Sequence, residues 1–104
     1  MEYWEGANLI GIGKFNSDPV GEVTGDSIQA CDYFPDGWGV EVRMDVNPTE
    51  TWETDRASTT YGKPAPYCTP WNFEDLAEGT PVSVKVCKVK GVEEDCKDPV
   101  LGAA

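Results

Sequence analysis

The chain of 104 residues contains no histidine. It therefore lacks the commonest general base of enzymes, which is also the usual partner of a serine or cysteine nucleophile. Its four cysteines include no CxxC pair, so a zinc site would need four scattered thiolates. Nineteen acidic residues would allow a glycosidase-type pair of carboxylates, but their spacing singles out no pair. We therefore expect a protein that is not an enzyme and uses no cofactor.

Positive charge is scarce as well, with 8 lysines and arginines against 19 acidic residues and a net charge of −11. Nucleic acids and anionic membranes attract basic surfaces, so both are disfavoured, whereas a basic protein partner is permitted. The alternative is that the acidic excess only keeps the protein soluble. The longest apolar run, residues 7–12, is short and interrupted, so we expect no membrane insertion. No signal peptide is recognisable, and Met1 is interpreted as the expression start of a mature form.

The cysteines that are present, at positions 31, 68, 87 and 96, are even in number and dispersed. This pattern favours two structural disulfides. A domain of this size buries a limited share of its surface and gains stability from such cross-links. Because disulfides persist in oxidising compartments, we expect a secreted, extracellular protein.

Short apolar runs bounded by turn residues predict an all-β fold, a small antiparallel sandwich that is Ig-like or barrel-like. We expect a single domain over residues 1–104, with 1–7 either a flexible arm or packed across a sheet edge. Within the expected strand 38–46, apolar and charged side chains alternate without exception from Val40 to Val46, so one face meets a core and the other meets water. The expected strands are 8–15, 21–24, 27–33, 38–46, 52–60, 80–90 and 93–98.

Two hairpins are expected. The turn at residues 34–37, with a proline and a glycine, should join 27–33 to 38–46. Gly91 and Val92 suit a two-residue type II′ turn before the last strand. In that register the facing pairs are Lys90–Glu93, Lys88–Asp95, Lys85–Asp98 and Cys87–Cys96.

The cysteine pairing follows from the last hairpin. Cys87 and Cys96 fall at a non-hydrogen-bonded site, where facing Cα atoms are close enough for a disulfide. We therefore predict the bridges Cys87–Cys96 and Cys31–Cys68. The lysines at 88 and 90 share a face with the valines at 82, 84 and 86, so this strand must leave the core or bulge near Cys87.

Residues 61–71 are expected to form an ordered surface loop, because their three prolines suit no central strand. One short helical turn is expected after it, capped by Asn72 and ended by Gly79. Aromatic residues on rigid loops commonly anchor interfaces and also serve as platforms for sugars. For Trp71 the alternative is that it only covers the Cys31–Cys68 bridge. The predicted binding residues are Tyr61, Pro64, Pro66, Tyr67, Trp71, Trp52 and Trp38.

Two further motifs have simpler interpretations. Asp32 and Asp36 flank a turn and offer oxygens to calcium, but their spacing is not that of an EF-hand, and we expect no bound metal. Gly11 and Gly13 lack the context of a phosphate loop and are expected to let a strand bend or approach another backbone.

A set of turns and cysteines resembles a group of known proteins. The segments are Ala30-Cys31-Asp32, Asp36-Gly37-Trp38-Gly39-Val40, Tyr67-Cys68, Gly79-Thr80-Pro81-Val82, Val86-Cys87 and Cys96. Together they resemble small secreted disulfide-containing β-sandwich proteins of actinomycetes, most of which have no known activity. Some proteins of this kind are adaptor subunits of streptomycete umbrella toxin particles. The resemblance implies a binding role and transfers no catalytic residue.

The sequence thus predicts a secreted, non-catalytic protein-binding module, an adaptor or structural subunit of an extracellular assembly. One alternative is a proteinaceous inhibitor that inserts residues 61–71 into the cleft of an extracellular hydrolase. Another is a carbohydrate-binding module that uses exposed tryptophans.

Overall fold

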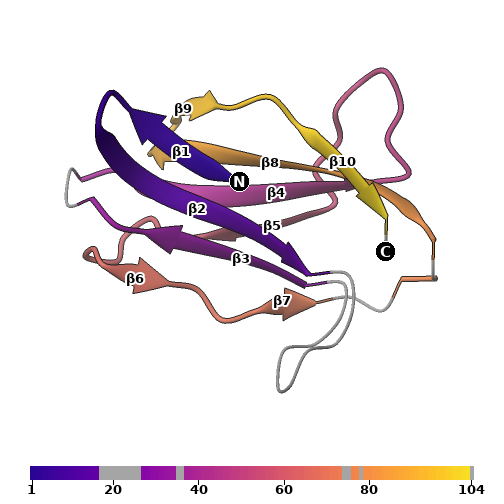
Figure 1. Cartoon of the computed structure of the whole chain (residues 1–104), viewed down its shortest axis with the longest axis horizontal. Helices are drawn as coiled ribbons and strands as arrows, with labels where there is room; N and C mark the ends of the chain where they lie inside the picture. The colour runs from indigo at the N-terminus through magenta and orange to yellow at the C-terminus, as the bar shows by residue number, and fades with distance from the viewer. Residues whose placement is uncertain (17–26, 35–36, 74–75, 78, 104) are drawn as a thin grey trace.

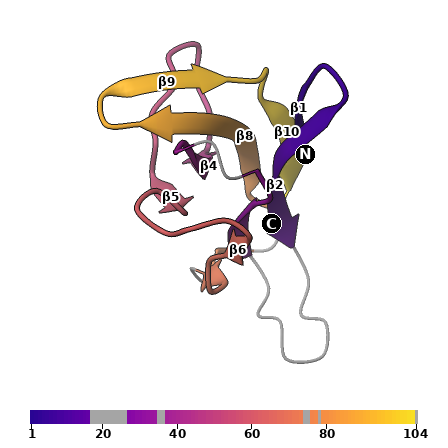
Figure 2. The same cartoon turned by 90° about the vertical axis from the view of Figure 1, so that its left-hand side faces the viewer.

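The computed structural model describes residues 1–16, 27–34, 37–73, 76–77 and 79–103. Within them the protein is all-β, with two antiparallel sheets (Figures 1 and 2). The first sheet contains β1 (Glu2–Glu5), β2 (Asn8–Asn16), β3 (Ser27–Asp32) and β6 (Tyr67–Cys68), with β7 (Asn72–Phe73) also beside β3. The second contains β10 (Val100–Ala103), β8 (Pro81–Lys90), β4 (Gly39–Val46) and β5 (Arg56–Thr59), with β9 (Glu93–Cys96) also beside β8. The predicted β-sandwich is confirmed.

The core lies between the two sheets. The inner face of β4, predicted from its alternation, consists of the fully buried Val40, Val42 and Met44. On β2, a Cβ at position 11 would stand 2.4 Å from the Val40 side chain and 2.5 Å from the carbonyl oxygen of Cys31. Gly11 therefore permits the close approach that the sequence suggested. The buried core residues are Tyr3, Ile10, Ile28, Ala30, Val40, Val42, Met44, Val82, Val84 and Val86.

Both predicted disulfides, Cys31–Cys68 and Cys87–Cys96, are present. The first joins β3 to β6, and the second joins the facing residues of β8 and β9. Gly91 has a φ of 60°, and Asn47 is the one non-glycine residue with positive φ in the described part of the chain. Val92 therefore has a negative φ, as the predicted type II′ turn requires.

The predicted hairpin between residues 27–33 and 38–46 is wrong. β3 pairs with β2, β6 and β7 in the first sheet, whereas β4 pairs with β5 and β8 in the second. β3 and β4 therefore lie in different sheets, and each turns an apolar face to the same core. Residues 35–36, and the strand expected at 21–24, lie outside the described residues.

The predicted helical turn after Asn72 is also wrong where the chain is described. Asn72 and Phe73 form β7, which pairs with Ile28 and Ser27 of β3. Pairing with a free strand edge outweighs the local capping signal, since helix propensity is a weak preference. No helix among the described residues is long and apolar enough to cross a membrane.

The N-terminal segment forms the edge strand β1 of the first sheet. β1 pairs with β2, Tyr3 is fully buried, and the terminal ammonium donates to the Gly13 carbonyl oxygen at 2.8 Å. The strand expected at 52–60 is limited to β5. β10, which pairs with the first half of β8, was not predicted.

β8 leaves the core without a bulge. It pairs with β4 continuously from Val82 to Val89. Lys88 lies beyond the core, where its ammonium bonds to Glu5 at 2.7 Å. The predicted Lys85–Asp98 pair is wrong, because the ladder between β8 and β9 ends at Cys87 and Cys96.

Candidate functional site

A groove lies where the connection from β3 to β4 meets the connection from β5 to β6. This is the end of the sandwich where β3 ends and β4 begins, at the left in Figure 1. Its volume is about 560 Å³. Phe34 and Trp38 line it from the first connection, and Tyr61, Lys63 and Pro64 line it from the second. Two segments distant in sequence thus form one concave surface.

Asp32 borders the same groove at the end of β3. Strand alternation places it on the face of Ile28 and Ala30, which is the core face. Its side chain is buried, with an exposed fraction of 2%, and its Oδ1 accepts a hydrogen bond from the Phe34 backbone N–H at 3.2 Å. A carboxylate buried in this way is costly unless it is hydrogen-bonded, so its position is fixed by the backbone.

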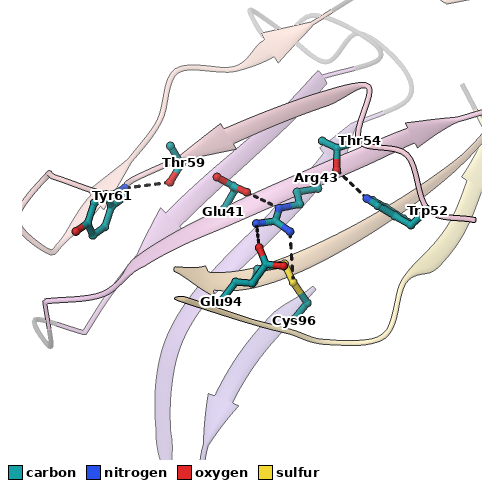
Figure 3. Close-up of polar contacts among 9 residues, drawn as sticks. Glu41, Arg43, Trp52, Thr54, Thr59, Tyr61, Glu94 and Cys96 are labelled. Carbon is teal, nitrogen blue, oxygen red and sulfur yellow. Dashed lines mark hydrogen bonds and ion pairs between the residues drawn. A yellow bond between two sulfur atoms is a disulfide. The ribbon is translucent and has the colours of Figure 1, made fainter. Parts of the chain in front are cut away.

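The Tyr61 wall is held by the start of β4. A Cβ at Gly39 would stand 2.5 Å from the Tyr61 Cα, so the two backbones are in contact. Thr60 is fully buried, its hydroxyl accepts a hydrogen bond from the Val40 N–H at 2.8 Å, and its own N–H donates to the Val40 carbonyl oxygen at 2.9 Å. The Tyr61 N–H donates to the Thr59 hydroxyl at 3.1 Å (Figure 3). The backbone of this wall is therefore ordered before any ligand binds.

The Trp38 wall is held by a cation. The Lys88 ammonium lies 4.7 Å from the centre of the Trp38 ring, and Glu5 neutralises it from β1. A cation over an indole face is attracted by the ring quadrupole. One face of Trp38 is thus occupied by the protein's own lysine, and the ring is steadied beside the groove.

The structure brings together three of the predicted binding residues, Trp38, Tyr61 and Pro64, at this groove. Pro66 follows on the same connection, and Tyr67 is the first residue of β6. Pro66 is exposed, and Tyr67 is half-buried with the Lys63 ammonium 6.0 Å from its ring centre.

Trp52 and Trp71 lie elsewhere. Trp52 lies on the outer side of the second sheet, where its Nε1 donates to the Thr54 hydroxyl at 2.8 Å (Figure 3). The Lys85 ammonium stands 4.2 Å from the Trp52 ring centre. Trp71 borders a separate cavity of about 460 Å³, together with Phe15, Val84 and Val100.

Sequence reasoning missed a charged cluster on the outer face of the second sheet. Arg43 forms ion pairs with Glu41 and Glu94, and its Nη1 lies 3.8 Å from the Cys96 sulfur (Figure 3). The hydrogen bond to Glu94 raises the pKa of Arg43, and the same bond lowers the pKa of the Glu94 carboxyl. Glu41 and Arg43 share a strand face in the sequence, but Glu94 joins them only once the hairpin register is known. The Arg43 guanidinium therefore lies beside the Cys87–Cys96 bridge.

Six groove residues were not predicted as binding residues: Asp32, Phe34, Gly37, Gly62, Lys63 and Ala65. Asp32 was considered only for calcium, with Asp36, which lies outside the described residues. Nowhere in the described ranges do three or more histidine, cysteine or acidic residues converge to hold a metal ion.

The groove is therefore a preformed surface with aromatic walls, one buried carboxylate and one exposed ammonium. Such a surface can stack against apolar or cationic groups and can accept and donate hydrogen bonds. No protein-family model, curated protein or solved structure matches the chain significantly.

Proposed function

We propose that this protein is a secreted, non-catalytic protein-binding module that contacts its partner through the groove. The observation that carries the proposal is the convergence of Trp38 and Tyr61 from separate connections onto one rigid concave surface. Large aromatic side chains with few rotatable bonds are typical anchors of protein interfaces. An adaptor or structural subunit of an extracellular assembly, as the actinomycete resemblance implies, is the role that such a module would have.

The rigidity of the groove supports binding to a protein. Ordering a flexible loop during association consumes interaction free energy, so a preordered loop binds better for the same contacts. The contact between Gly39 and Tyr61 and the hydrogen bonds of Thr60 supply that order. Two disulfides support a location outside the reducing cytoplasm.

The charges at the groove support a non-catalytic role. Among the described residues that border it, Asp32 is the one carboxylate. Hydrolysis of a glycosidic bond uses two carboxyl groups on either side of the scissile bond. Binding needs no such pair.

A carbohydrate-binding module is the second candidate, and one observation favours it. Tyr61 and Trp38 lie beside the polar groups of Asp32 and Lys63, so stacking and hydrogen bonds are available in one place. The hydrolase-inhibitor alternative rests on the sequence pattern alone.

The test is a pull-down from the culture supernatant of the producing organism, with the immobilised chain and two matched variants. Tyr61→Ala removes a groove side chain that is 47% exposed, and Trp4→Ala removes one that is 45% exposed on β1 and does not border the groove. We expect a discrete protein to be retained by the wild type and by Trp4→Ala, and lost with Tyr61→Ala. Equal retention by both variants would overturn the proposal.

A further inference from the structure

We infer that the groove receives an arginine side chain from an extended segment of the protein partner. The inference rests on the proposed function and adds the chemistry of the contact. It is carried by three features that meet at the groove: aromatic ring faces, a buried carboxylate and the acidic charge of the whole chain.

The ring faces are the first feature. Phe34, Trp38 and Tyr61 border the groove. The planar guanidinium group stacks on such faces and is attracted by their quadrupoles, most strongly by indole. The chain already contains cation–π contacts elsewhere. The ammonium groups of Lys85 and Lys97 lie 4.2 and 4.5 Å from the ring centres of Trp52 and Tyr3.

The second feature is the carboxylate of Asp32. Asp32 is buried at the end of β3 and held by the Phe34 N–H, so it is a fixed acceptor beside the rings. Hydrogen bonds from a guanidinium to a carboxylate are charge-assisted and directional. A neutral ligand could donate a hydrogen bond to the carboxylate but would form no ion pair with it.

The third feature is the net charge of −11. Opposite charge on a partner steers the encounter and disfavours acidic competitors. Two local cations oppose this attraction. The exposed Lys63 borders the groove, and Lys88 lies over one face of the Trp38 ring, where Glu5 neutralises it. Removing the Lys63 charge should therefore strengthen the binding of a cation.

The experiment uses the full chain labelled with ¹⁵N and a blocked pentapeptide, acetyl-Gly-Ser-Arg-Ser-Gly-amide. Matched peptides carry lysine, or the neutral arginine analogue citrulline, at the central position. We expect the arginine peptide to shift the amide signals of the groove residues at millimolar concentration. The citrulline peptide should bind about tenfold more weakly, because it keeps the N–H donors but forms no ion pair with the carboxylate.

Three variants test the partners of the guanidinium. Asp32→Asn keeps the acceptor for the Phe34 N–H and should weaken arginine-peptide binding about tenfold, whereas Lys63→Gln should strengthen it about threefold. Glu93→Gln removes the same charge from an exposed position on β9 and should change binding less than about twofold. If Asp32→Asn does not fold, Lys63→Gln still tests the sign of the charge effect.

Equal binding of the citrulline and arginine peptides, or equal effects of Asp32→Asn and Glu93→Gln, would overturn the inference. So would weaker binding by Lys63→Gln. A β-linked glucose hexamer that shifts the same amides when the arginine peptide does not would identify a sugar site. If Tyr61→Ala abolishes capture of the partner and Asp32→Asn does not, the proposed function stands and the arginine inference fails.

Discussion

Gly39 and Tyr61 are in backbone contact, and a Cβ on Gly39 would lie within 2.6 Å of both the N and the Cα of Tyr61. Backbone atoms cannot yield as the end of a flexible side chain can. The start of β4 and the Tyr61 wall of the groove must therefore move together.

The first prediction is that Gly39→Ala damages both stability and binding. The added methyl group must displace the Tyr61 backbone, and we expect a loss of about 3 kcal/mol in the free energy of unfolding. Chemical denaturation measures it. Gly37→Ala is the control, because its positive φ strains alanine but the space around it is open, so it should cost only about 1 kcal/mol. Equal losses in the two variants would contradict the proposed contact.

The second prediction separates Trp71 from Tyr61. Trp71 is half-buried beside Phe15 and Val84, away from the groove, so Trp71→Ala should lower stability by about 3 kcal/mol and leave partner affinity unchanged. Tyr61→Ala should do the reverse, with a loss of affinity of about 2 kcal/mol and a change in stability below about 0.5 kcal/mol. Calorimetric titration and denaturation on both variants give the comparison. A fall in affinity with a folded Trp71→Ala protein would place the interface at the other cavity.

The third prediction ranks the disulfides. Cys31 and Cys68 are 37 positions apart, whereas Cys87 and Cys96 are 9 apart. In the chain-entropy model the longer loop contributes about 4 kcal/mol and the shorter about 3 kcal/mol. Replacing Cys31 and Cys68 together by alanine should therefore lower the midpoint of guanidinium unfolding more than replacing Cys87 and Cys96. The opposite ranking would show that Arg43 and its ion pairs depend on the shorter bridge for their geometry.

The fourth prediction concerns alkaline pH. Burial, with the hydrogen bond to Asp95, raises the pKa of Tyr3 above its usual value of about 10. The folded state thus retains a proton that the unfolded chain loses, so this contribution to stability is complete below about pH 10 and declines as the pH rises above it. Tyr3→Phe should flatten that decline, measured as urea midpoints between about pH 8 and 11. Tyr33→Phe, which removes a hydroxyl from an exposed ring, is the matched control, and the same flattening there would refute the assignment.

Predictions from the sequence succeeded where the signal was local. The alternation in β4 and the turn at Gly91 each depend on adjacent residues, and together they identified a core face and the Cys87–Cys96 register. The β3–β4 hairpin failed because a turn motif does not show whether the chain stays in one sheet or crosses to another. β7 failed because Asn72 carries a helix-capping signal, whereas the edge of β3 that it joins is distant in the sequence.

The candidate site was predictable only in part. The prolines around Tyr61 marked a rigid aromatic loop, and Trp38 was among the predicted binding residues. Their meeting at one groove depends on the contact of Gly39 with Tyr61, which no local pattern encodes. Asp32 was not predicted as a groove residue, because the sequence does not show whether an aspartate at a strand end is buried or exposed.

The ladder between β4 and β8 has a kinetic consequence. It pairs Val46 with Val82 and Gly39 with Val89, so the central strands of the second sheet meet only after a long stretch of chain has closed. Sheets dominated by such distant pairings fold in milliseconds to seconds. The Cys31–Cys68 bridge closes a loop that contains the residues of β4 and β5. Even in the unfolded chain, this bridge keeps those residues close to the residues of β3 and β6. Refolding with that bridge intact should therefore be faster than refolding from the reduced chain, because the covalent link already holds distant segments of the chain close together.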